Sequence, residues 1–216
     1  VGGPSHSGRR ARGTEACHPG TRMNRTAYPD RSLHTASSAL VPADFLQSIF
    51  VAELRSRGIR YRGFLYAGVI VDKSGMVHVL EFNCRLGDPE TQVLMARLES
   101  DLADVLVRAA TGKLDGATLR WSRNSAAVVV MASEGYPATV KDGREISGLF
   151  EPAEDLIVFH AGTEKRGDRI FTKGGRVLGV TALGPSLNAA LERVYIGVSK
   201  LHFEGAQFRR DIGRDR

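Results

Sequence analysis

The sequence predicts an α/β fold, of the α+β kind, in which helices on an antiparallel sheet precede a smaller β-rich unit. Two observations lead to this prediction. Two runs of β-forming residues flank a turn at 72–75, and a long stretch with helical periodicity follows them. Beyond residue 112 the chain shows short apolar runs separated by Gly- and Pro-containing turns. We therefore expect residues 41–112 to form one unit, and residues 113–216 to form a small domain of barrel or sandwich type.

Residues 1–40 differ from the rest in composition. They are rich in Gly, Ser, Pro and Arg and show almost no apolar periodicity, which is typical of disordered chain. Six arginines against two acids give this stretch +4 of the total net charge of +6. Two interpretations remain open: an organelle transit peptide, although no amphipathic helix is evident, or a truncated, non-native start. Because the first residue is Val, we expect a fragment or a processed chain.

The composition indicates a globular protein and argues against a membrane-spanning or nucleic-acid-binding one. A hydrophobic share of 42% and a charged share of 25% are ordinary for a globular protein. No apolar run approaches the ~20 residues that a membrane helix needs. Cys17 and Cys84 form no metal-binding or disulfide pattern, so we expect a reducing cytoplasm. The arginines concentrate in the tail, which argues against a basic face for nucleic acid.

Between residues 41 and 112 we expect a helix, a hairpin and a second helix. The predicted bounds are a helix from Pro42 to Gly58, strands Tyr61–Val71 and Met76–Asn83, and a helix from Pro89 to about Ala110. The near-continuous apolar character of the strands predicts burial on both faces up to Glu81. Gly112 then ends the second helix.

The remaining residues predict a β-rich unit that ends in a helix. The expected elements are strands Ser125–Ser133, Leu156–Phe159 and Arg176–Ala182, turns at Asp142-Gly143 and Lys173–Gly175, and a helix from Ser186 to Lys200.

Three polar residues at the end of the second predicted strand form the candidate site. Glu81, Asn83 and Arg85 occur at every second position, so on a strand they share one face. Carboxylate and amide oxygens suit a hard divalent cation such as Mg²⁺, and a guanidinium suits a phosphoryl group bound to that cation. The alternative is the solvated face of a half-buried strand. The flanking Gly87-Asp88-Pro89 predicts a tight turn in which Asp88 caps the next helix, where anions are often bound.

With these segments placed, the chain resembles the carboxy-terminal half of the phosphoribosylamine–glycine ligase family. The resemblance covers about residues 58–213. It is carried by the stretches 63–68, 81–92, 132–137, 160–163, 174–178 and 210–213. A Glu-x-Asn-x-Arg strand is shared by ATP-grasp enzymes generally, whereas the Gly-Asp-Pro-Glu continuation and the later stretches are specific to this family.

The resemblance implies a partial ATP-grasp domain and an ATP-dependent ligase of purine biosynthesis that joins glycine to 5-phosphoribosylamine. ATP and Mg²⁺ (or Mn²⁺) are the implied cofactors. The partners are small molecules, with no nucleic acid or membrane, and the full-length parent is expected to be a monomer. The implied roles are Glu81 and Asn83 as metal ligands, Arg85 as the catalytic charge stabiliser, Asp88 as an amine-positioning residue or a helix cap, and Gly174, Gly175 and Arg176 as a ribose-phosphate site or a plain hairpin turn.

The departures from the family lead to a further expectation. No Gly-rich phosphate loop and no amino-terminal substrate domain precede residue 41, and the nearest acid before Glu81 is Asp72. We therefore expect one metal site to be less complete and the isolated chain to have little or no ligase activity. Two other functions stay open: another ATP-grasp ligase or carboxylase, and a non-catalytic basic binding module.

Overall fold

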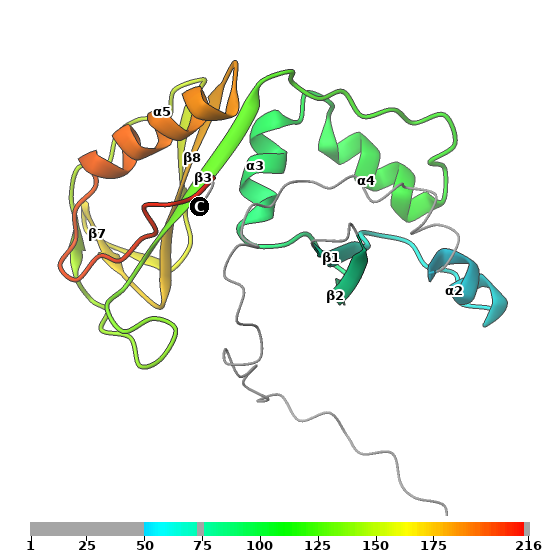
Figure 1. The fold of residues 1–216 in the computed structure, drawn as a ribbon, viewed down its shortest axis with the longest axis horizontal. Coiled ribbons are helices and arrows are strands. Elements are labelled where there is room, and N and C mark those ends of the chain that lie inside the picture. The colour runs from blue at the N-terminus through cyan, green and yellow to red at the C-terminus, as the bar shows by residue number, and fades with distance from the viewer. Residues whose placement is uncertain (1–49, 73–75, 214–216) are drawn as a thin grey trace, which may run out of the picture. The chain divides into compact units, whose positions relative to one another are not determined.

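The computed structural model describes residues 50–72 and 76–213 (Figure 1). These residues belong to the second of two units into which the chain divides, Ser32–Arg216. The predicted disordered tail, most of the predicted first helix and the turn at 73–75 lie outside the described residues. The described end of that helix is α2 (Ala52–Ser56), and Gly58 follows it with a φ of 70°, a conformation that favours glycine at a helix end.

The predicted hairpin is formed by β1 (Tyr66–Val71) and β2 (Val77–Asn83), which pair antiparallel. The first arm begins at Tyr66, five residues later than predicted. Gly68 pairs with Glu81, and the register shifts directly after it. A Cβ atom at Gly68 would lie 3.1 Å from Cγ of Glu81, so a residue without a side chain suits this position.

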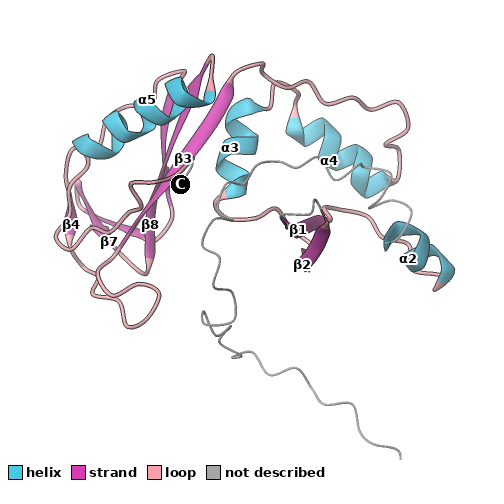
Figure 2. Ribbon diagram, viewed as in Figure 1, coloured by secondary structure: helices cyan, strands magenta, loops and turns pink. Residues whose placement is uncertain are grey.

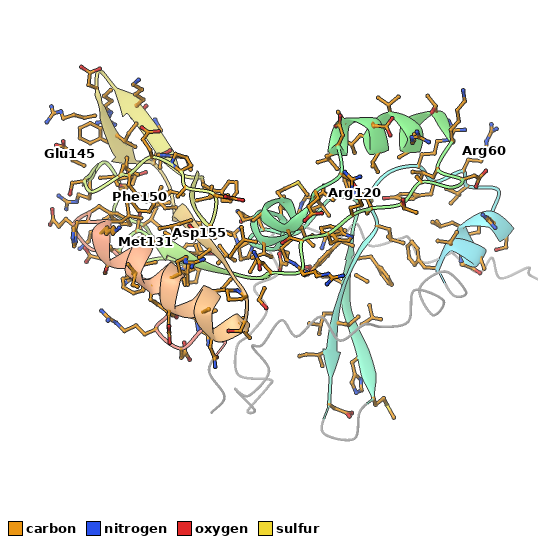
Figure 3. All side chains as sticks on the ribbon, turned by 90° about the horizontal axis from the view of Figure 1, so that it is seen from above. Arg60, Arg120, Met131, Glu145, Phe150 and Asp155 are labelled. Carbon is orange, nitrogen blue, oxygen red and sulfur yellow. The ribbon has the colours of Figure 1, made fainter. Side chains whose placement is uncertain are left out.

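The prediction that this hairpin is buried on both faces is wrong. Val79, Leu80 and Phe82 are 45%, 47% and 42% exposed. Side chains stand out on both sides of the hairpin ribbon (Figure 3). Phe50 stacks on Phe82 with ring centroids 4.4 Å apart, but among the described elements β1 and β2 contact mainly each other. An apolar run shows only that a strand is suited to burial. Whether it is buried depends on which other elements pack against it.

The predicted long second helix is two helices, α3 (Glu90–Arg97) and α4 (Leu102–Thr111). Leu98 is extended and forms an isolated bridge with Trp121, which interrupts the helix. Asp101 then caps α4, because its side chain accepts a hydrogen bond from the Ala103 amide at 2.8 Å. Gly112 ends α4 in the left-handed conformation, as predicted.

The chain returns from α4 to run beside the residues that separate the two helices. The Glu99 amide donates to the Arg120 carbonyl at 3.0 Å, and the Ser122 amide donates to the Arg97 carbonyl at 2.8 Å. The Arg120 amide also donates to Oγ of Ser100 at 2.7 Å. Helix α4 therefore lies in a loop whose two ends are hydrogen-bonded to each other.

The three predicted strands of the second region are confirmed and form one antiparallel sheet. Its strand order is β3–β8–β5, with β3 spanning Ser125–Ala132, β8 spanning Arg176–Gly184 and β5 spanning Leu156–His160. The central strand β8 is almost entirely buried, which is expected for a strand that has a neighbour on each side and a helix on each face.

Helices contact both faces of this sheet (Figure 1). On one face, Gly197 of α5 (Leu187–Lys200) lies close to Val180 and Leu156. On the other, Gln92 of α3 lies close to Gly179, the residue before Val180 in β8. Successive strand residues point to opposite faces, so α5 and α3 cover different sides. The predicted helix from Ser186 is confirmed, and Oγ of Ser186 accepts from the Ala189 amide.

A second sheet of short strands went unpredicted (Figure 2). Its order is β4–β7–β6, with β4 at Glu145–Ile146, β7 at Arg169–Thr172 and β6 at Thr163–Arg166. These strands are short and mostly polar, so they lack the apolar run that marks a strand in a sequence. The two sheets of this region share no strand, and the described residues form no closed barrel.

The hydrophobic core lies between α5 and the sheets. Its buried residues are Ala127, Val129, Met131, Ile146, Val177, Leu178, Val180, Ala182, Ala190, Leu191, Val194, Val198, Leu201 and Phe203. Figure 3 shows Met131 within this packed region. None of the described helices is long and apolar enough to cross a membrane.

Candidate functional site

The predicted metal ligands lie side by side at the end of β2. Asn83 Nδ2 donates a hydrogen bond to Glu81 Oε1 at 3.0 Å, so both side chains occupy the same face of the strand, as the period of two predicts. Glu81 is exposed and Asn83 is half-buried. The pair presents a carboxylate and an amide that solvent can reach.

Arg85 lies beyond the strand, contrary to the prediction that it continues the row. Strand β2 ends at Asn83, and Arg85 is in the following bend. Its Nη1 donates to the neighbouring Leu86 carbonyl at 3.0 Å, and the side chain is exposed. Arg85 therefore follows the Glu81–Asn83 pair by two residues, on a segment that is not part of the strand.

Tyr66 gives this corner of the hairpin an electrostatic signature that sequence reasoning missed. Tyr66 pairs with Asn83 across the hairpin. Burial, followed by the neighbouring carboxylates of Glu90 and Glu81, raises the pKa of the Tyr66 hydroxyl. Two carboxylates thus lie near one phenol at the end of β2.

The donor set fits a magnesium ion that is shared with phosphates. Among the described residues no cluster of three or more His, Cys, Asp or Glu side chains could hold a metal by itself. Mg²⁺ is usually held by one or two protein oxygens together with waters and phosphate oxygens. Glu81 and Asn83 supply that number of protein ligands.

Asp72 does not add a third ligand. His78 Nε2 lies 2.9 Å from Asp72 Oδ2, and the Met76 amide donates to Asp72 Oδ1 at 3.0 Å. Asp72 lies toward the opposite end of the hairpin, four positions past Gly68, the partner of Glu81, which is roughly 13 Å at 3.3 Å per strand residue.

Asp88 does not cap a helix, which corrects one of its two predicted roles. Helix α3 begins at Glu90, its N-cap is Pro89, and no side chain caps it. Instead, Asp88 Oδ2 lies 3.1 Å from Arg176 Nη2, and Asp88 Oδ1 accepts from Gln92 Nε2 at 3.1 Å. Arg176 Nη1 also donates to the Asp88 carbonyl at 2.8 Å.

The segment 173–175 is not a hairpin turn. It connects β7, which pairs with β4 and β6, to β8, which pairs with β3 and β5, so it passes from one sheet to the other. Oγ of Ser133 donates to the Gly174 carbonyl at 2.7 Å, and the Ser133 amide donates to the Gly175 carbonyl at 2.8 Å. A Cβ atom at Gly175 would lie 2.5 Å from the Tyr136 ring. The backbone directly before Arg176 is thereby held in place.

The structure thus brings the predicted residues together in two groups. Glu81 and Asn83 form one, and Arg176 joins Asp88 in the other, with Gly174 and Gly175 at its base. Gln92 and Tyr136 were missed. The spacing of Gln92, four residues after Asp88, is the spacing of neighbours on a helix surface and could have indicated the contact. Nothing local in the sequence points to the packing of Tyr136 against Gly175.

Two stretches of the chain match one known family. Residues 126–215 match phosphoribosylglycinamide synthetase, C domain, and residues 30–91 match the ATP-grasp (A) domain of the same synthetase. A phosphoribosylamine–glycine ligase from Ralstonia nicotianae is 48% identical over 174 residues, which are 79% of this chain and 41% of that protein. The chain belongs to the phosphoribosylglycinamide synthetase family. It spans about two fifths of the length of the curated members that it matches.

Solved structures agree with this membership. The crystal structure of the phosphoribosylamine–glycine ligase from Thermotoga maritima has a TM-score of 0.64 and 34% identity, and the match covers 76% of this chain and 40% of that one. The biotin carboxylase domain of the Hydrogenobacter thermophilus 2-oxoglutarate carboxylase has a TM-score of 0.54 with 18% identity, covering 80% and 39%. The second likeness shows the shared fold alone. The predicted partial ATP-grasp fold is confirmed.

Proposed function

We propose that this chain is the carboxy-terminal part of an enzyme that ligates glycine to 5-phosphoribosylamine at the expense of ATP. The observation that carries the proposal is the Glu81–Asn83 pair, at the end of β2 in the part of the chain that matches the ATP-grasp domain. The 48% identity to a phosphoribosylamine–glycine ligase over most of the chain supports the choice of substrates.

The proposed reaction has two steps. A glycine carboxylate oxygen attacks the γ-phosphorus of ATP, which gives glycyl phosphate and ADP. The amine of phosphoribosylamine then attacks the glycyl carbon, phosphate leaves, the amine loses a proton, and an amide bond forms in glycinamide ribonucleotide. In the first step negative charge is spread over the oxygens of the transferred phosphoryl group, and in the second it develops on the glycyl oxygen and the leaving phosphate. Positioning and charge stabilisation are therefore what the protein contributes.

We assign the metal ligands to Glu81 and Asn83, with Mg²⁺ as the first choice and Mn²⁺ as the alternative. Bound there, the cation would neutralise phosphate charge. The biotin carboxylase domain from Hydrogenobacter thermophilus, which shares the fold, was crystallised with the magnesium salt of ADP, in line with this class of cofactor. The exposed position of Glu81 and the acidic surroundings of Tyr66 favour the assignment.

The other roles are proposals of the same kind. We propose that Arg85 stabilises the charge on the transferred phosphoryl group, which its exposed guanidinium can do after leaving the Leu86 carbonyl. We propose that Asp88, fixed by its neighbours, orients the substrate amine. Gly174 and Gly175, which lie directly before Arg176, are proposed to bring backbone groups close to a ribose phosphate.

Calorimetry with the 216-residue chain tests whether Glu81 and Asn83 form a half-site, that is, this chain's part of the nucleotide–metal site. We expect Mg·ADP to bind to the unmodified chain and the signal to be lost in Glu81→Ala. Glu154→Ala removes an exposed glutamate from the other region and serves as the matched control, with binding unchanged. Binding that is equal in both variants would contradict the metal assignment. A repeat with Mn²⁺ decides between the cations.

A second candidate function is carboxylation, which the structural likeness to a biotin carboxylase domain favours. In a chimera, residues 42–213 would replace the matching stretch of the Ralstonia ligase. We expect ADP release from this chimera to require glycine and phosphoribosylamine. ADP release that requires bicarbonate instead would select the carboxylase.

We also propose how the chain behaves by itself. We expect little or no turnover by the isolated chain, a monomer in the full-length parent, a cytoplasmic location and a domain boundary near residue 112. The free Cys84 supports a reducing compartment. Nucleic acid is not among the proposed partners, and DNA binding that weakens steeply with salt would instead support the basic binding module.

A further inference from the structure

Arg176, the first residue of β8, contacts the turn that follows β2. Arg176 contacts Asp88 twice, through Nη1 to the backbone carbonyl at 2.8 Å and through Nη2 to Oδ2 at 3.1 Å. Gln92 contacts the remaining carboxylate oxygen at 3.1 Å. The carbonyl and both side-chain oxygens of Asp88 are therefore engaged.

This contact is better suited to fixing an orientation than to stabilising the fold. The side chains of Arg176 and Asp88 are 40% and 45% exposed, and exposed ion pairs contribute little to the free energy of unfolding. A planar guanidinium that bonds two different acceptors nevertheless restricts the geometry strongly. The donor itself is anchored, because Ser133 and Tyr136 hold Gly174 and Gly175 directly before it.

We infer that Arg176 is a positioning residue for the nucleotide–metal site. By clamping Asp88 to β8 it fixes the segment 84–89, which links the Glu81–Asn83 pair and Arg85 to the start of α3. A residue that the sequence matches to the C domain would thus set the geometry of the ATP-grasp strand. The inference rests on the proposed function, because the position of Glu81 and Arg85 matters only if they meet a nucleotide.

The chain offers a closely matched control. Arg193 also combines a carboxylate, Asp155 Oδ2 at 2.7 Å, with a backbone carbonyl, that of Leu183. Its side chain and that of Asp155 are 37% and 47% exposed. Leu183 belongs to the opposite end of β8 from Arg176, so the same type of contact is made away from the candidate site.

The test compares Arg176→Gln, Arg176→Lys and Arg193→Gln in the full 216-residue chain, with Glu81→Ala as the site knockout. Three quantities are measured: the thermal midpoint, the affinity for Mg·ADP by calorimetry, and amide hydrogen exchange in residues 85–91. We expect Arg176→Gln to weaken Mg·ADP binding roughly tenfold, the size typical of residues that orient metal ligands, and to speed exchange in that segment. Arg193→Gln should change neither quantity.

The Lys variant separates positioning from charge. Lysine keeps the charge but cannot bond both acceptors with a fork, so we expect Arg176→Lys to recover only part of the affinity. Full recovery would show that charge alone matters and would overturn the inference.

The outcomes also distinguish this inference from the proposed function. If Glu81→Ala abolishes binding while Arg176→Gln behaves like Arg193→Gln, the function stands and the inference is wrong. If the unmodified chain does not bind Mg·ADP, the proposed half-site fails. Exchange then decides by itself: faster exchange in residues 85–91, confined to Arg176→Gln, supports the clamp, and unchanged exchange overturns it.

Discussion

Residues 50–121 and residues 125–213 use the same kinds of elements and bury their side chains very differently. Every buried hydrophobic residue of the described chain lies at Ala127 or beyond. Ten of the thirteen large hydrophobic side chains that are exposed lie between Ile59 and Trp121. The second region therefore has a core of its own, whereas the described part of the first region relies on hydrogen-bonded local structure and on the contacts of α3 with β3 and β8.

The comparison shows that the proposed metal ligands lie in one region and depend on contacts with the other. The proposed metal ligands, Glu81 and Asn83, are on the hairpin, in the region that buries least. The segment that follows this end of the hairpin is tied to the region that buries most, because Arg176 of β8 bonds Asp88 and α3 contacts β3 and β8. Stability and site geometry are thus supplied by different residues, and they can be perturbed separately.

The largest expected effect tests the difference in burial. Leu178→Ala removes a side chain that is 1% exposed and should lower the free energy of unfolding by about 3 kcal/mol. Leu80→Ala removes the same atoms from a side chain that is nearly half exposed and should cost about 0.5 kcal/mol or less. Denaturant unfolding of both variants measures the contrast. Equal losses would show that the hairpin is covered in solution and would remove the distinction between the regions.

A second, intermediate effect concerns site geometry without loss of the core. Gly68→Ala places a methyl group 3.1 Å from Glu81 Cγ, so Glu81 must shift by a few tenths of an ångström. We expect Mg·ADP affinity to fall by about threefold, with the unfolding midpoint nearly unchanged. Gly179→Ala is the control, because its nearest contacts, at 3.7 Å, are ordinary. Unchanged affinity in Gly68→Ala would mean that Glu81 has room to move and that its exact placement is unimportant.

The smallest effect is a pH dependence confined to the first region. Because burial and Glu90 raise the pKa of Tyr66, folding favours the protonated phenol. This contribution is fully present below the unfolded pKa of about 10 and is lost as pH rises through the higher folded pKa.

Ultraviolet absorbance titration of the phenols measures this shift. Tyr66→Phe should remove one late-titrating phenol, and Glu90→Gln should move that phenol toward the ordinary pKa. A Tyr66 titration unaffected by Glu90→Gln would exclude Glu90 and leave burial and Glu81 as the causes.

The parts of the fold that the sequence predicts well are those with strong local signals. The apolar run at Ser125–Ala132 and the Ser186 cap each define an element without reference to distant residues. The break between α3 and α4 was missed because it depends on Trp121, a partner far along the chain. The hairpin was predicted but its exposure was missed, because apolar residues carry no information about what covers them.

The residues of the candidate site likewise divide into those with a local sequence signal and those whose contacts are distant in the chain. Glu81 and Asn83 could be paired from their spacing, since alternation on a strand is a local rule. Asp88 could not be assigned, because a residue before Pro89 reads as a helix cap and its actual partner, Arg176, is 88 positions away. The packing of Tyr136 on Gly175 is likewise a tertiary contact. The proximity of Glu81 and Asn83 could be predicted from the sequence, and the distant contacts that hold Asp88 and Gly175 could not.

The pairing of residues 97–100 with residues 120–122 has a consequence for how this protein can vary. Since the two ends of the excursion are joined by Arg97–Ser122 and Glu99–Arg120, the path from α3 to β3 is closed without α4. Evolution or an engineer can therefore lengthen, shorten or exchange the excursion while the strand that follows it keeps its place. The position works as a modular insertion point, at which new surface can be added to the protein without rebuilding its sheet.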